Sequence, residues 1–223
     1  MKNMWIWFLI LSIAFFPCFY WIFHRICCSS YQEEQNRNSK IFKSKGEILL
    51  IVLGELGLSG FWYHEMENGE SLLLFILCFV MMTALAAAAK ADLLERIVPN
   101  RLLVLLLLFL PIFIGCFAIR DIESAVEILP DVFWGFAFSA FSFGLGYLLS
   151  RGSMGAGDVK LAIVIGLYFT GKYVVGVIFY GCIVAAVYSG VQLLRRKITR
   201  KTQIPFVPFL YLGAVINSLR FLF

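Results

Sequence analysis

The stretch "SLLLFILCFVMMTALAAAAKADLLERIVPNRLLVLLLLFLPIFIGCFAI", residues 71–119, consists of two long apolar runs joined by one short polar segment. Each run approaches the roughly 20 residues that a helix needs to cross a bilayer. A bilayer core offers no water to an unpaired backbone group, so apolar runs of this length are expected to be helices. The small side chains of "ALAAAAKA" (84–91) would let neighbouring helices approach closely. This stretch therefore predicts an all-α membrane fold.

The same pattern recurs along the whole chain, which has 223 residues and is 61% hydrophobic and only 15% charged. We predict a polytopic membrane helix bundle of about eight transmembrane helices. It would form one integral-membrane domain, 1–223, with a short cytoplasmic loop at about 24–46. The expected spans are 4–23, 47–63, 71–89, 101–119, 132–149, 159–170, 173–193 and 205–223.

Basic residues are distributed unevenly between the connecting segments. Of the 19 Lys and Arg residues, 15 fall in the segments 24–46, 90–101, 150–160 and 194–204. Lys and Arg concentrate on the cytoplasmic side of short loops, so these four segments are expected there, with both chain ends on the opposite side. The net charge of +5 is then explained by topology and by attraction to anionic membrane lipid. No nucleic-acid partner is predicted.

Two other residue types bear on cofactors and on buried charge. No pair of the six cysteines has the spacing of a zinc site, and Cys27 and Cys28 are adjacent, so we predict no metal. Glu55, in "LLIVLGELGLSG" (49–60), is an ionisable group inside an expected span, where such groups are costly and usually face the bundle interior. A structural hydrogen-bonding role and a functional role both remain open for Glu55.

The chain contains four aspartates, and two of them, Asp92 and Asp158, lie at the expected cytoplasmic edge. If the third and sixth spans pack together, these carboxylates can face each other. A pair that shares one proton can activate a water and protonate a substrate carbonyl. In "RGSMGAGDVKLA" (151–162), Gly155 and Gly157 would let a peptide backbone approach. Helix capping and an ion or proton pathway in a transporter remain open from these residues alone.

Three motifs in order resemble those of the type IV prepilin peptidases, integral-membrane aspartyl proteases with a Gly-x-Gly-Asp motif. "GAGDVKLA" (155–162) looks like the second aspartate motif, and "ADLLERIVPN" (91–100) is similar to the first. "IPFVPFLYLGAV" (204–215) resembles the closing segment, and "PCFYWIFHR" (17–25) is a weaker echo of the N-terminal stretch.

The resemblance implies that Asp92 and Asp158 are the catalytic pair, with Gly155 and Gly157 shaping the active loop. Lys160, Pro99 and Asn100 are the supporting candidates that it implies. It further implies an enzyme of the inner (plasma) membrane that removes the short basic leader of prepilins or pseudopilins at the cytoplasmic face. The alternative is a proton- or ion-coupled transporter that uses the same carboxylates.

Two departures from the family pattern affect its cofactors and its closing motif. Longer members carry a four-cysteine zinc module in the first cytoplasmic loop, and segment 24–46 has only Cys27 and Cys28. Many members also methylate the product with S-adenosylmethionine. No residue set here specifies that cofactor, so proteolysis without a cofactor is expected and methylation stays an open question. Val207 stands where the closing motif usually has glycine.

Overall fold

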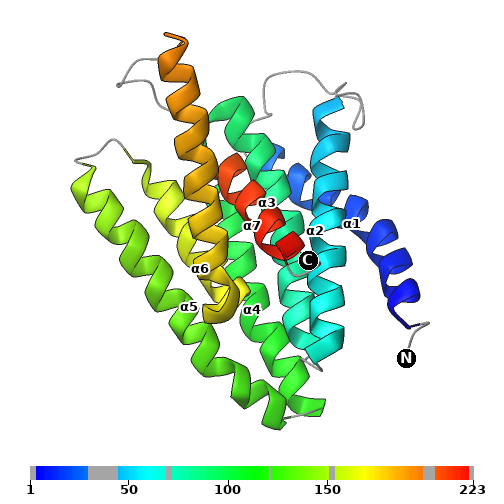
Figure 1. Ribbon diagram of the computed structural model, residues 1–223. Coiled ribbons are helices and arrows are strands. Elements are labelled where there is room, and N and C mark those ends of the chain that lie inside the picture. Colours follow the sequence, from blue (N-terminus) through cyan, green and yellow to red (C-terminus); the bar gives the residue numbers. More distant parts are fainter. Residues whose placement is uncertain are drawn as a thin grey trace.

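The computed structural model describes residues 4–29, 45–68, 72–120, 122–150, 154–197 and 204–220 (Figure 1). Within these ranges the chain is helical and contains no strand, which confirms the predicted all-α helix bundle. The helices are α1 (Met4–Ser29), α2 (Lys45–Asn68), α3 (Leu72–Glu95), α4 (Asn100–Arg120), α5 (Ile122–Leu149), α6 (Ala156–Leu194) and α7 (Val207–Leu219).

Three of the described helices, α3, α5 and α6, are long and apolar enough to cross a membrane. The apolar parts of α2, α4 and α7 are shorter. Together they form a membrane-type helical bundle. Most of the loop predicted at 24–46 lies outside the described residues. Its first residues continue α1 to Ser29, and its last ones begin α2.

The two spans predicted at 159–170 and 173–193 lie in the single element α6. Its backbone is not helical at Thr170, where φ is 56° and ψ is 176°. A positive φ is unusual for a residue that carries a Cβ, and it reverses the chain here. Figure 1 shows the two parts of α6 running in opposite directions. The predicted division between the sixth and seventh spans therefore falls at the observed break.

Helix α3 is the central element of the bundle. It contacts α1, α2, α4, α6 and α7. In its most apolar window 83% of the residues lie inside the protein, compared with 22% in the corresponding windows of α5 and α6. The alanines of the stretch 84–91 are all buried. Small side chains here leave room for neighbours on every side of α3.

Glycines mark close helix contacts in both parts of α6. Gly135 of α5 and Gly166 of α6 face each other, and a Cβ on either one would overlap the backbone carbonyl of the other. In the part of α6 after Thr170, a Cβ on Gly213 of α7 would overlap Val177 and Gly181. The part of α6 that begins with Asp158 is thus packed tightly against α5, and the part after Thr170 is packed tightly against α7.

Candidate active site

The first site carboxylate belongs to the last turn of α3. Asp92 is only 4% exposed. Its carbonyl accepts a hydrogen bond of 2.9 Å from the backbone N–H of Arg96, which has a φ of 57° and ends the helix. A left-handed residue directly after a helix is a common terminator. The chain then turns through Val98 and Pro99 into α4, where the Pro99 carbonyl accepts the N–H of Leu102 at 3.1 Å.

The second carboxylate belongs to the first turn of α6. Gly155 precedes this helix with an extended backbone, and its carbonyl accepts the N–H of Asp158 at 3.1 Å. Gly157 packs against the α3–α4 turn, where an added Cβ would lie 3.3 Å from the Cβ of Val98. An added Cβ on Gly155 would lie 3.4 Å from Oδ2 of Asp158 itself. The two glycines thus bring the start of α6 against the end of α3.

A third segment, at the start of α7, fixes the first carboxylate. The backbone N–H of Val207 donates to Oδ2 of Asp92 at 3.0 Å. Pro205 and Pro208 flank this position and have no N–H to donate. A charged acceptor makes such a hydrogen bond stronger than a neutral pair would. Val207 itself is fully buried, so the side chain that departs from the usual glycine packs inside the protein.

Both carboxylates line one cavity of about 360 Å³. Their charges are close enough to interact, and the Arg96 guanidinium also interacts with Asp92. Figure 1 shows that the end of α3 and the starts of α6 and α7 lie at the same end of the bundle. The described residues that line the cavity are Asp92, Arg96, Ile97, Val98, Asn100, Gly155, Gly157, Asp158, Lys160, Ile204, Pro205 and Phe206.

The structure brings six of the seven predicted site residues to this cavity. Besides the two aspartates they are Gly155, Gly157, Lys160 and Asn100. Lys160 Nζ lies 3.5 Å from Asn100 Oδ1, to which it donates, so the two side chains connect α6 and α4. Pro99 lines an adjoining hollow instead, next to Cys27. The chemical roles of these residues remain predictions.

Sequence reasoning missed several lining residues. Arg96, Ile97 and Val98 follow Asp92 directly, and a tight turn after the helix end is what returns them to the cavity. The segment 204–206 belongs to the closing motif "IPFVPF". The sequence gives the position of this motif in the chain, but it did not predict that the motif lies at the cavity. The two prolines of this motif were the available signal, because they limit which backbone groups can donate.

Glu55 does not line the cavity. It lies on α2 and interacts electrostatically with Tyr211 of α7, whose hydroxyl donates to the backbone carbonyl of Leu50. Tyr211 follows Val207 by one helical turn. Glu55 thus belongs to the contact between α2 and α7 and not to the lining of the cavity that contains the two aspartates.

No group of three or more His, Cys, Asp or Glu that could hold a metal occurs among the residues searched, which are the described ones. Most of the loop between α1 and α2 lies outside that search, so the expectation of no metal stays a prediction. The same holds for the expectations on S-adenosylmethionine and on nucleic acid.

The fold is an apolar helix bundle, and two aspartates from different helices share one cavity in it. These features define a membrane-embedded protein with a paired-carboxylate site. The chain belongs to the type IV leader peptidase family, because the family model matches residues 72–190. That match contains both Asp92 and Asp158. It ends before α7, so the hydrogen bond from Val207 comes from outside the matched region.

A relative with a curated name is also similar to this chain. It is the "Prepilin leader peptidase/N-methyltransferase" of Bacillus subtilis (strain 168), which is 28% identical over 140 residues. The alignment covers 63% of this chain and 54% of the relative, so the chain spans about half the length of this relative. No solved structure matches the chain.

Proposed function

We propose that this protein is a membrane-embedded aspartic endopeptidase that removes the short basic leader of prepilins or prepilin-like proteins. The observation that carries the proposal is the shared cavity of Asp92 and Asp158. Membership of the type IV leader peptidase family supports it, and so does the name of the relative. N-methylation of the product rests on that name alone and is left to a separate assay with S-adenosylmethionine.

The proposed reaction uses the two carboxylates as an acid and base pair. The ionised carboxylate removes a proton from a water, whose oxygen attacks the scissile carbonyl carbon, while the protonated carboxyl gives its proton to the carbonyl oxygen. When the tetrahedral intermediate collapses, the C–N bond breaks, the leaving amine takes a proton from the first carboxyl, and the second carboxylate takes a proton back from a hydroxyl of the intermediate, which restores the singly protonated pair. Backbone hydrogen bonds from Val207 and Phe206 hold the Asp92 carboxylate in place for this chemistry.

The mechanism requires one proton on the pair, so cleavage is expected to fall at both low and high pH. Measurement of kcat/KM across the pH range tests this shape. A rate that stays constant from about pH 4 to pH 9 would contradict the shared-proton mechanism.

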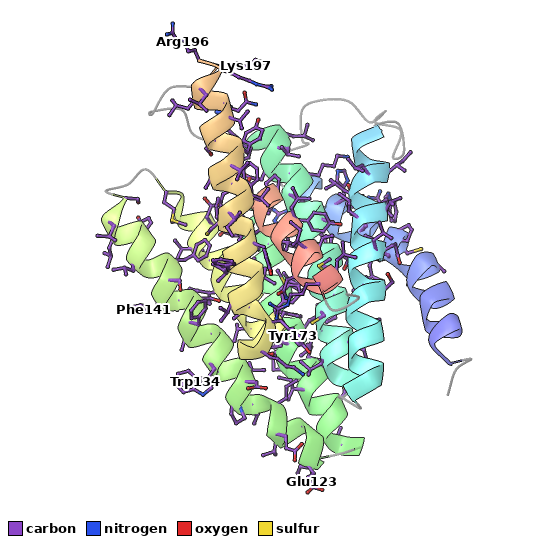
Figure 2. All side chains as sticks on the ribbon, in the orientation of Figure 1. Glu123, Trp134, Phe141, Tyr173, Arg196 and Lys197 are labelled. Carbon is purple, nitrogen blue, oxygen red and sulfur yellow. The ribbon has the colours of Figure 1, made fainter. Side chains whose placement is uncertain are left out.

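Charge supports a site at the cytoplasmic face of a multi-pass plasma-membrane protein. The basic residues Arg196 and Lys197 follow the end of α6 at one end of the bundle, and Glu123 lies at the opposite end (Figure 2). The carboxylate cavity lies toward the basic end. Because basic loops concentrate in the cytoplasm, the proposal places cleavage there. Cysteine labelling of residues 195–197 from either side of sealed vesicles tests this orientation.

The decisive experiment measures cleavage of a prepilin by purified protein in liposomes. We expect Asp92→Asn and Asp158→Asn each to lose cleavage by a factor on the order of 1,000. Asp131→Asn is the matched control, because Asp131 is an exposed aspartate of α5 that does not line the cavity. Full activity of either cavity variant would remove that residue from catalysis. Proton flux without cleavage by the wild-type protein would favour the transporter alternative.

A further inference from the structure

Helix α4 is packed on only one side. Its buried residues form a single stripe of Leu102, Leu103, Leu106 and Leu110. The other side exposes large apolar side chains, including Val104 (55%), Leu108 (62%) and Ile112 (57%). Exposed apolar residues are ordinary on a helix that meets lipid, so exposure alone assigns no role to this face.

This face also holds a groove of about 540 Å³. The described residues that line it all come from α4, and beyond Asn100 and Arg101 at its start they are apolar. Asn100, Val104, Leu108 and Ile112 are spaced by four residues, so they follow one another along the same side of the helix. At 1.5 Å per residue, the groove extends about 18 Å from Asn100 to Ile112. That is the length of about twelve residues of a partner helix.

The groove adjoins the carboxylate cavity. Asn100 lines both of them, and it also lines the smaller hollow beside Cys27. Asn100 is therefore the point at which an apolar path along the bundle meets a polar pocket that contains two carboxylates. Exposed apolar residues on α5, such as Phe133 and Trp134, line neither the groove nor the cavity.

At Asn100 the surface changes from apolar to polar, and a bound substrate must change from a helix to an extended chain at the same place. A peptide bond within a helix has its carbonyl hydrogen-bonded and its backbone enclosed by side chains, so cleavage requires a locally extended chain. An apolar helix fits the groove, while an extended segment fits the polar cavity. The carboxamide of Asn100, which accepts a hydrogen bond from Lys160, lies where the apolar groove meets the polar cavity.

We propose that the α4 groove, formed by Val104, Leu105, Leu108, Phe109 and Ile112, is the docking site for the apolar helix of the substrate. The scissile segment leaves this helix at Asn100 and enters the cavity between Asp92 and Asp158. The proposal rests on the proposed peptidase function and adds to it the face of the bundle from which the substrate enters.

The test compares two substrates. One joins a basic leader to an apolar helix of about 20 residues, and the other is a short peptide that spans the same bond without the helix. Leu108→Trp fills the groove, and Leu148→Trp is the matched control, because Leu148 is an exposed leucine (75%) of α5 outside the groove. We expect Leu108→Trp to lower the preference for the long substrate, measured as a ratio of kcat/KM values, by about tenfold. Leu148→Trp should keep the wild-type preference.

Photocrosslinking provides a second measurement that does not depend on turnover. A photoreactive residue placed at 108 or 112, in an Asp158→Asn background, should crosslink to the helix of the long substrate, whereas one at 148 should not. A preference that Leu108→Trp leaves unchanged, or that Leu148→Trp lowers equally, would overturn the docking proposal, as would crosslinks only at 148. The peptidase proposal fails separately, if Asp92→Asn and Asp158→Asn still cleave the short peptide.

Discussion

The two site carboxylates are held in opposite ways. Asp92 is enclosed on the central helix α3, and a backbone N–H from α7 fixes one of its oxygens. Asp158 is half-buried in the first turn of α6 and follows the two glycines of its motif. A distant segment, the start of α7, therefore fixes the Asp92 carboxylate, whereas the Asp158 carboxylate is held by the backbone of Gly155, three residues before it. Substitutions at Asp92 and at Asp158 should therefore lower cleavage by different factors.

The largest expected difference comes from lengthening each side chain by one methylene. Asp92→Glu cannot keep the Val207 hydrogen bond in an enclosed position, so we expect cleavage to fall by about 100-fold or more. Asp158→Glu changes a half-buried side chain, which has more room to adjust, and should lose about tenfold. The measurement is kcat on the same prepilin for both variants. Equal losses, or the reverse order, would contradict the comparison.

A smaller loss is expected from the glycines before Asp158. The added methyl of Gly157→Ala would meet Val98, which must shift by a few tenths of an ångström, so we expect about a tenfold lower kcat. Gly155→Ala meets only the Asp158 side chain, at an ordinary contact distance, and should lose less. The matched control is Gly144→Ala on α5, where an added Cβ has no atom within 4 Å. A loss in Gly144→Ala as large as in Gly157→Ala would argue against this account.

The support of α6 by α5 is tested through stability. Gly166→Ala places a methyl against the Gly135 carbonyl and the Ser139 hydroxyl. Overpacking of this kind costs about 1–3 kcal/mol of the free energy of unfolding. Thermal unfolding in detergent should show a lower midpoint for Gly166→Ala and none of this change for Gly144→Ala. An unchanged midpoint would contradict the tight contact between α5 and α6 at this position.

The smallest effect is expected on the Asp92 side, at the far contact of α7. Tyr211→Phe removes the hydroxyl that donates to the Leu50 carbonyl, which should cost about 0.5–1.5 kcal/mol of stability. Tyr188→Phe, at a 45% exposed tyrosine of α6, is the control and should unfold as the wild type does. If Tyr211→Phe were the more stable of the two, the contact between α2 and α7 would not support α7.

The helices could be predicted because apolar runs of membrane length leave few other structures available. Their arrangement could not be predicted in the same way. Lipid and protein interior are similarly apolar, so hydrophobicity does not distinguish the enclosed helix α3 from the more exposed α5 and α6. The small side chains at 84–91 indicate close contact with neighbouring helices, but only the structure shows that these alanines are all buried and that α3 is the central helix.

For the site, the sequence identified the residues but did not show that they lie close together in space. Asp92 and Asp158 lie near each other because α3 and α6 are in contact, which was a condition of the sequence argument and not its result. The role of the Val207 N–H could not be predicted from the sequence, because every residue except proline has the same backbone donor. Only the flanking Pro205 and Pro208 distinguish this position in the sequence.

The burial of α3 has a consequence for how the surrounding membrane acts on the protein. A helix in contact with lipid responds to a thinner or thicker bilayer by changing its tilt. Helix α5 presents Trp134 and Phe141 outward, and much of α6 is exposed, while α3 is shielded by its neighbours (Figure 2). Bilayer thickness therefore acts mainly on α5 and on the part of α6 after Thr170, whereas the part of α6 that carries Asp158 is largely buried, as α3 is, so the spacing of the pair should depend little on lipid composition.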